Sequence, residues 1–128
     1  MATQRRILLV EDSKDLRFLM KTELEWSGYM VDVAADAYEG LNLARTHCPD
    51  VIISDIQMPG LDGFEFVRQL RQTPQLAGVP AIALTGFDLN YEVKKTAGGF
   101  SAHVVKPVDT SELVALIRQL TGRKKHAA

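Results

Sequence analysis

The sequence has little of three things: cysteine, surplus positive charge and long apolar runs. Cys48 is the single cysteine, so no disulfide can form within the chain, and a disulfide-stapled secreted scaffold is excluded. Lysines and arginines number 15 against 16 aspartates and glutamates, and the formal charge of −1 argues against direct binding to nucleic acid. The apolar run at residues 7–10 is too short for a signal peptide or a membrane span. We therefore expect a cytoplasmic protein that makes no contact with a membrane.

The length and composition indicate one globular domain. The 128 residues are 46% hydrophobic and 24% charged, which is enough apolar material for a core and too little chain for a second domain. We place the domain at residues 1–122. The basic segment 123–128 is predicted to be a disordered tail.

Short apolar runs alternate with longer amphipathic stretches five times along the chain. The runs, predicted to be strands, lie at residues 7–10, 30–34, 51–54, 81–84 and 102–105. Apolar residues recur at helical spacing in two of the stretches between and after them: Leu16, Leu19, Met20 and Leu24, then Leu113, Leu116, Ile117 and Leu120. Both stretches are predicted to be helices that pack on the sheet through these residues. This alternation predicts an α/β fold, a doubly wound five-stranded parallel sheet in the order 2-1-3-4-5 with five helices, as in flavodoxin-like proteins.

Three predicted helices begin with an aspartate followed three residues later by a glutamate. The pairs are Asp36 with Glu39, Asp62 with Glu65, and Asp109 with Glu112. This spacing is typical of capping boxes, with the aspartate as N-cap. Residues 58–60, Met-Pro-Gly, predict a turn just before the second of these caps. The helix expected between residues 86 and 99 is the weakest of the five, and we expect it to be short and mobile.

Polar residues follow four of the five predicted strands. Glu11 and Asp12 follow the first, Asp55 the third, Thr85 the fourth and Lys106 the fifth. In the expected strand order these strands are neighbours, so their carboxyl ends should bring the side chains into one crevice.

The composition of this crevice predicts phosphoryl chemistry. Carboxylates packed together repel one another and recruit a hard divalent cation, for which Mg²⁺ is the best fit. A hydroxyl from Thr85 and an ammonium from Lys106 would stabilise charge on a phosphoryl group, and Asp55 is the expected nucleophile.

The sequence resembles the response-regulator receiver domain, the CheY-like family of two-component signalling. The motifs that carry the resemblance are LLVEDS, DVIISDIQMPGLDGFE, AIALTG and AGGFSAHVVKPVD, and together they span almost the whole chain. The phrase GFSAHVVKPVD is also similar to the receivers attached to hybrid sensor kinases, and single-domain regulators carry it too. The resemblance implies a phosphorylation switch without an enzymatic output of its own.

The resemblance also implies a role for each site residue. Asp55 would accept a phosphoryl group from the phosphohistidine of a sensor kinase or a phosphotransfer protein. Glu11, Asp12, Asp55 and the main-chain carbonyl of Gln57 would bind Mg²⁺. Thr85 and Lys106 would hold the phosphoryl oxygens, and Thr85 with His103 would form the switch. The output face would comprise the fourth helix, fifth strand and fifth helix, which would act on a downstream effector of unspecified identity from a monomer or a weak homodimer.

Several residues depart from the common pattern of the family. Gln57 and Phe87 border the route by which water would reach the phosphoryl group. Gly86 stands where the family often has alanine or serine. His103 replaces the usual tyrosine or phenylalanine, and because an imidazole titrates near neutral pH, we expect its switching to depend on pH.

Two other functions are compatible with the same fold and differ from a phosphorylation switch in their chemistry. The first is a pseudo-receiver, an interaction module that keeps the fold without being phosphorylated; the full set of acids, threonine and lysine argues against it. The second is an enzyme on the same topology. The acidic loop after the first strand would repel the phosphate of a flavin, and Gln57 cannot serve as the general acid of an aspartate-type phosphatase.

Overall fold

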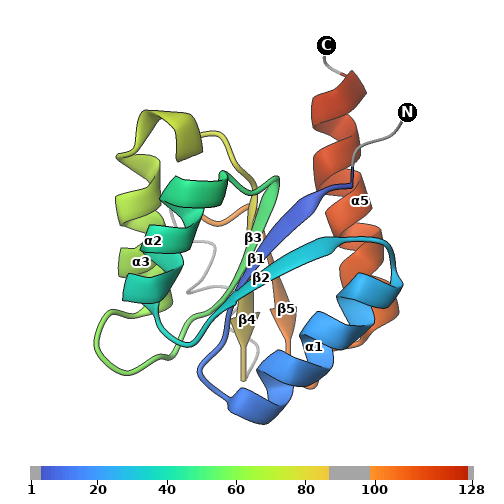
Figure 1. The fold of residues 1–128 in the computed structure, drawn as a ribbon, viewed down its shortest axis with the longest axis horizontal. Coiled ribbons are helices and arrows are strands. Elements are labelled where there is room, and N and C mark those ends of the chain that lie inside the picture. The colour runs from blue at the N-terminus through green and yellow to red at the C-terminus, as the bar shows by residue number, and fades with distance from the viewer. Residues whose placement is uncertain (1–3, 87–98, 127–128) are drawn as a thin grey trace.

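A computed structural model describes residues 4–86 and 99–126, and its centre is a parallel β-sheet in the strand order β2-β1-β3-β4-β5 (Figure 1). The strands are β1 (Arg6–Val10), β2 (Met30–Ala34), β3 (Val51–Asp55), β4 (Ala81–Thr85) and β5 (Ala102–Val105). The described helices are α1 (Lys14–Trp26), α2 (Ala37–His47), α3 (Gly63–Arg71) and α5 (Thr110–His126), with a 3-10 turn at Pro74–Leu76. Each adjacent pair of strands is parallel, so the predicted doubly wound order is confirmed.

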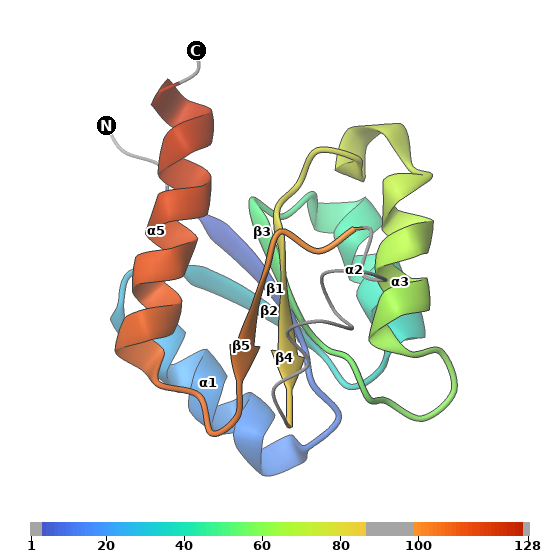
Figure 2. The same ribbon diagram turned by 180° about the vertical axis from the view of Figure 1, so that it is seen from behind.

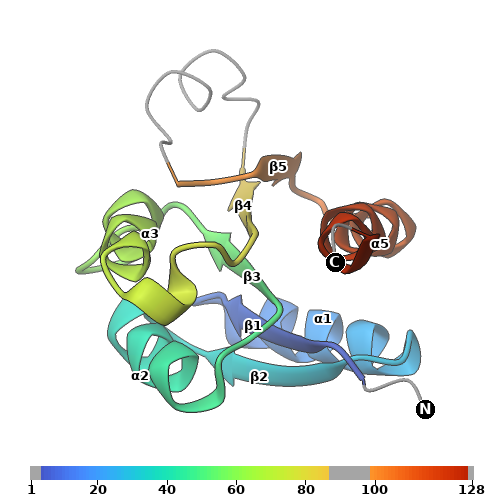
Figure 3. The same ribbon diagram turned by 90° about the horizontal axis from the view of Figure 1, so that it is seen from above.

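The helices cover both faces of the sheet. Helices α1 and α5 lie together on one face, and α2 and α3 lie on the other (Figures 2 and 3). Successive strand residues point to opposite faces. In β1, Ile7 and Leu9 pack in the core beneath α1 and α5, whereas Leu8 and Val10 pack beneath α2 and α3. Strands buried on both faces need continuous apolar sequence, which explains the runs that predicted them.

The predicted aspartate caps are present at all three helix starts. Asp36 accepts a hydrogen bond from the Glu39 N–H, and Asp62 accepts one from Glu65, both at 2.9 Å. The Oδ1 atom of Asp109 accepts from the N–H groups of Ser111 and Glu112. The predicted turn before α3 is also present: Gly60 has a φ of 80°, a left-handed conformation that glycine adopts without strain.

One prediction about α1 is wrong. Met20 and Leu24 are buried against the sheet, but Leu19 is 53% exposed. Leu19 lies on the outward side of the helix with Phe18 and Trp26, which are 72% and 86% exposed. The outward residues share the helical spacing of the inward ones, so periodicity alone could not assign Leu19 to a face.

The two remaining structural predictions concern the chain beyond these elements. The helix expected between residues 86 and 99 falls on residues 87–98, which lie outside the described residues. Helix α5 runs to His126, and the behaviour of segment 123–128 stays a prediction. No helix within residues 4–86 and 99–126 has the length and apolar character needed to cross a membrane.

Candidate functional site

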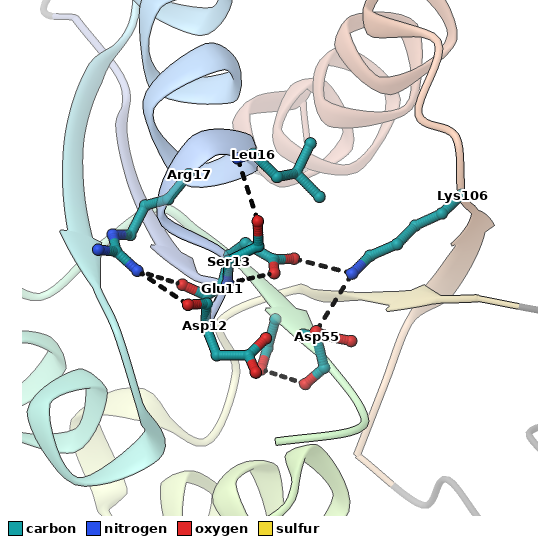
Figure 4. Close-up of polar contacts among 8 residues, drawn as sticks. Glu11, Asp12, Ser13, Leu16, Arg17, Asp55 and Lys106 are labelled. Carbon is teal, nitrogen blue, oxygen red and sulfur yellow. Dashed lines mark hydrogen bonds and ion pairs between the residues drawn. The ribbon is translucent and has the colours of Figure 1, made fainter. Parts of the chain in front are cut away.

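Four strands deliver polar residues to one end of the sheet, as their order requires. Glu11 directly follows β1, and Asp55 is the last residue of β3. Thr85 ends β4, and Lys106 directly follows β5. Because β1, β3, β4 and β5 are consecutive neighbours, these residues lie at one edge of the sheet, where Glu11, Asp55 and Lys106 point toward one another (Figure 4). The predicted convergence of the four strand ends is therefore present in the structure.

The acids form a compact cluster. One carboxylate oxygen from each of Glu11, Asp12 and Asp55 lies within 4.8 Å of the others. Glu11 is fully buried and Asp55 is 5% exposed, whereas Asp12 is exposed to solvent. Carboxylates so close together repel one another strongly where water is excluded. The cluster therefore needs positive charge.

Lys106 supplies part of that charge. Its Nζ atom lies 3.0 Å from Glu11 Oε1 and 3.2 Å from Asp55 Oδ2 (Figure 4). The main-chain N–H of Lys106 donates to the carbonyl of Thr85 at 2.7 Å, so β4 and the segment after β5 are joined at the site. The peptide bond between Lys106 and Pro107 is cis. One ammonium thus faces two buried carboxylates.

Burial and charge shift the pKa values of these groups. Burial raises the pKa of Glu11 and of Asp55 above the ordinary values, and the nearby carboxylate of Asp12 adds to the rise at Asp55. Burial alone would lower the pKa of Lys106, but the ion pairs with Glu11 and Asp55 outweigh it and raise that pKa. Lys106 therefore stays charged, while the carboxylates remain incompletely compensated.

The donor set fits a divalent cation. Among the described residues, no group makes a well-aligned hydrogen bond to the buried Glu11 Oε1, whose close neighbour is the Lys106 ammonium. Hard cations such as Mg²⁺ bind carboxylate and carbonyl oxygens and keep waters that a phosphate oxygen can replace. Buried carboxylates with one ammonium between them are the feature expected of such a site.

The structure also places the other predicted residues. Thr85 is buried at the end of β4, beside the Lys106 segment. Gln57 is exposed in the loop after β3. His103 lies on β5, away from the acid cluster, on an open groove of about 540 Å³ that β5 forms with α5. Phe87 lies outside the described residues.

Three residues near the acids escaped the sequence analysis. The Ser13 N–H donates to Glu11 Oε2 at 2.9 Å, and its hydroxyl caps α1. The guanidinium of Arg17 donates to the main-chain carbonyl of Glu11. A Cβ atom on Gly63 would lie 2.5 Å from the carbonyl oxygen of Asp55. Only Ser13 carried a sequence signal, as a residue with high N-cap propensity before a helical run.

The fold and the acid cluster together define a class: doubly wound α/β domains with clustered carboxylates and a lysine at the carboxyl end of the sheet. The model of the response regulator receiver domain matches residues 7–118, and the chain belongs to this family. It is therefore a receiver domain of two-component signalling, as the motifs predicted.

Relatives and solved structures agree with this assignment. The chain is 40% identical to an uncharacterized 14.6 kDa protein of Leptolyngbya boryana over 91% of this chain and 89% of the relative. Chemotaxis protein CheY4 of Vibrio cholerae has a similar structure, with a TM-score of 0.86, 32% identity and coverage of 92% and 99% of the two chains.

A third relative comes from a sensor kinase. The receiver domain of sensor histidine kinase PA1611 from Pseudomonas aeruginosa, solved with a magnesium ion in its active-site cleft, has a TM-score of 0.85 and 29% identity, covering 94% and 99% of the two chains. Several other curated relatives are longer proteins, and the chain spans only about half their length.

Proposed function

We propose that this domain is a phosphorylation-activated switch in which Asp55 accepts a phosphoryl group from a phosphohistidine. The donor is a sensor histidine kinase or a phosphotransfer protein. The observation that carries the proposal is the placement of a buried Asp55 within one cluster with Glu11, Asp12 and the Lys106 ammonium. Charge of both signs at one carboxylate is what phosphoryl transfer requires.

The transfer step involves one bond made and one broken. A carboxylate oxygen of Asp55 attacks phosphorus, and the bond from phosphorus to the imidazole nitrogen of the donor breaks. The electron pair of that bond goes to the imidazole, which takes a proton from solvent and leaves as the neutral side chain of the donor. The product is an acyl phosphate on Asp55. The domain promotes only its own phosphorylation and dephosphorylation and processes no other substrate.

Glu11, Asp12, Asp55 and the main-chain carbonyl of Gln57 are the proposed Mg²⁺ ligands. When bound, Mg²⁺ neutralises charge on the carboxylates and on the phosphoryl oxygens. Support for this ligand set comes from the acid cluster and from the burial of Glu11 and Asp55 within it. The similar receiver domain of PA1611 holds a magnesium ion in its own cleft.

Lys106 and Thr85 are the proposed partners of the phosphoryl oxygens. The Lys106 Nζ atom already lies 3.2 Å from Asp55 Oδ2, so a small movement of a flexible side chain would bring it to a phosphoryl oxygen. The main-chain bond between Lys106 and Thr85 would transmit a movement of either residue to the other.

The proposed output follows from this movement. Thr85 and His103 shift, and the face of β5 and α5, together with the helix that the sequence predicts between residues 86 and 99, changes its affinity for a downstream effector. The groove between β5 and α5, with His103 on its wall, supports β5 and α5 as part of that face. We place the domain in the reducing cytoplasm, because its exposed thiol Cys48 has no second cysteine in the chain with which to pair. The proposed oligomeric state is a monomer or a weak homodimer.

The test is phosphorylation by acetyl phosphate, with and without Mg²⁺, read by intact mass. We expect the wild type to gain one phosphoryl group only with Mg²⁺, and Asp55→Asn to gain none. Asp62→Asn is the matched control, because asparagine also caps a helix and α3 should stay intact. If no adduct forms, and beryllofluoride also fails to bind, the pseudo-receiver alternative replaces this proposal.

A further inference from the structure

Arg17 reaches back from α1 to the loop that carries the two acids (Figure 4). Its Nη1 atom donates to the main-chain carbonyl of Glu11 at 2.8 Å and lies 3.5 Å from the main-chain carbonyl of Asp12. The guanidinium therefore binds the backbone of both residues, and the hydrogen bonds leave their carboxylates available to a cation.

Other contacts fix the remaining polar groups of Glu11. Its N–H donates to the carbonyl of Ala34 at 3.1 Å, which ties it to β2. Its Oε2 atom accepts from the Ser13 N–H at 2.9 Å. With the carbonyl held by Arg17, the peptide plane between Glu11 and Asp12 has a set orientation, because the peptide bond is rigid. That plane determines where the Asp12 side chain leaves the backbone.

The location of Arg17 has an electrostatic cost. The N-terminal end of a helix carries partial positive charge and favours anions, yet this guanidinium lies near that end of α1. A cation beside the acid cluster would also repel a bound divalent cation. Both electrostatic terms are unfavourable to an arginine at this position. The hydrogen bonds from its guanidinium to the main chain of Glu11 and Asp12 are the favourable interactions that oppose them.

We propose that Arg17 is a positioning residue for the divalent cation, acting through the main chain of Glu11 and Asp12. The inference rests on the proposed function, because it assumes that these two residues are metal ligands. Positioning and charge alone predict opposite changes in Mg²⁺ affinity when Arg17 is removed. If Arg17 acted only through its charge, removing it would strengthen Mg²⁺ binding; if it positions the loop, removing it weakens binding.

The experiment measures Mg²⁺ affinity by calorimetry on the full chain without phosphodonor. Three variants are compared with the wild type: Arg17→Met, Arg17→Lys and Lys21→Met. Lys21 is the control because it lies one turn further along α1, where it pairs with Glu25 and does not contact the acids. We expect Arg17→Met to lose about tenfold in affinity, as for other residues that orient metal ligands. Arg17→Lys should lose less, because it keeps the charge and one donor, and Lys21→Met should bind as the wild type does.

Arg17→Met binding Mg²⁺ as tightly as the wild type, or more tightly, would overturn the proposal. Thermal unfolding of each variant shows whether it is folded. A loss of affinity in Arg17→Lys equal to that in Arg17→Met, with Lys21→Met unchanged, would still support positioning, since it would mean that the guanidinium geometry is essential.

A second measurement separates failure of this proposal from failure of the proposed function. Amide hydrogen exchange at Ser13 in the metal-free protein should be roughly tenfold faster in Arg17→Met than in the wild type, because the loop opens more readily. If the wild type binds no Mg²⁺, the metal site of the proposed function fails, whereas unchanged exchange at Ser13 shows that Arg17 does not order the loop.

Discussion

The charged side chains at the two ends of the β-sheet differ in how deeply they are buried. Near the amino end, Asp32 Oδ2 lies 3.0 Å from both Arg6 Nη1 and His47 Nδ1. The Asp50 carboxylate there accepts from the Arg6 N–H at 2.7 Å. At the carboxyl end, the buried Glu11 and Asp55 share the single ammonium of Lys106.

This difference in burial helps to distinguish ion pairs on the surface of the fold from carboxylates that form a binding site. Partly exposed pairs such as Arg6 with Asp32 contribute little to the free energy of unfolding. Buried carboxylates that outnumber their cations oppose folding, and they persist where a ligand will compensate them. Burial of the carboxylates therefore distinguishes the candidate site from the opposite end of the same sheet.

The largest expected effect compares two glycines at the two ends. Gly63→Ala should lower the free energy of unfolding by about 3 kcal/mol, because its Cβ would meet main-chain atoms of Asp55 and Ile56 at 2.5 and 2.8 Å, which cannot rotate away. Gly78, before β4, has open space around it, and Gly78→Ala should change that free energy by about 0.5 kcal/mol or less. Urea denaturation of both variants measures the difference. Equal losses in the free energy of unfolding would mean that the end of β3 can move to make room for the added methyl group.

The next comparison removes one cation from each end. Lys106 and Arg6 are 25% and 29% exposed, so burial is matched. Lys106→Met should lower the free energy of unfolding of the metal-free protein by about 2 kcal/mol, because two buried carboxylates lose their counter-ion. Arg6→Met should cost about 1 kcal/mol or less.

Adding Mg²⁺ sharpens that comparison. The cation should raise the melting temperature of Lys106→Met by more than it raises that of Arg6→Met, because it replaces the missing positive charge at the acid cluster. Equal increases in the two variants would show that the acids near Lys106 are not where the cation binds.

A smaller effect should appear in the pH dependence of the metal-free protein. Burial raises the pKa of Glu11 and Asp55, so the folded state binds protons more tightly than the unfolded state. The free energy of unfolding should therefore fall as pH rises from about 4 through these raised pKa values. The raised pKa of Lys106 stabilises the fold below about pH 10 and does not alter this window.

Two matched variants test that sign. Asp55→Asn should melt at a higher temperature than the wild type at pH 7, and the difference should shrink toward pH 4. Asp32→Asn, which loses the pairing with Arg6 and His47, should melt at a slightly lower temperature at pH 7. A wild type that gains stability between pH 4 and 7, with no benefit from Asp55→Asn, would contradict the charge imbalance.

The strands could be predicted from local apolar runs, and the convergence of their polar ends could be predicted from the expected strand order. Apolar runs define buried parallel strands, and the strand order then determines that Glu11, Asp55 and Lys106 meet. The roles assigned to Gln57 and His103 stay predictions, since they depend on a carbonyl direction and a conformational change that sequence patterns do not encode.

The features that escaped prediction depend on side-chain conformation and close packing. Arg17 contacts a main-chain carbonyl six residues earlier, and such a contact has no residue-type signature. The need for glycine at position 63 arises from the approach of α3 to the end of β3, which only the folded structure shows. The face of Leu19 was ambiguous because α1 carries apolar residues on both its inward and outward sides.

The most direct test of the central claim locates the modified residue itself. Borohydride reduces an aspartyl phosphate to homoserine, so the chain is treated with acetyl phosphate and Mg²⁺, reduced, digested and sequenced by mass spectrometry. The account predicts homoserine at position 55 alone, and only when Mg²⁺ is present. Homoserine at position 12, or at Asp32 or Asp50 near the other end of the sheet, would contradict it.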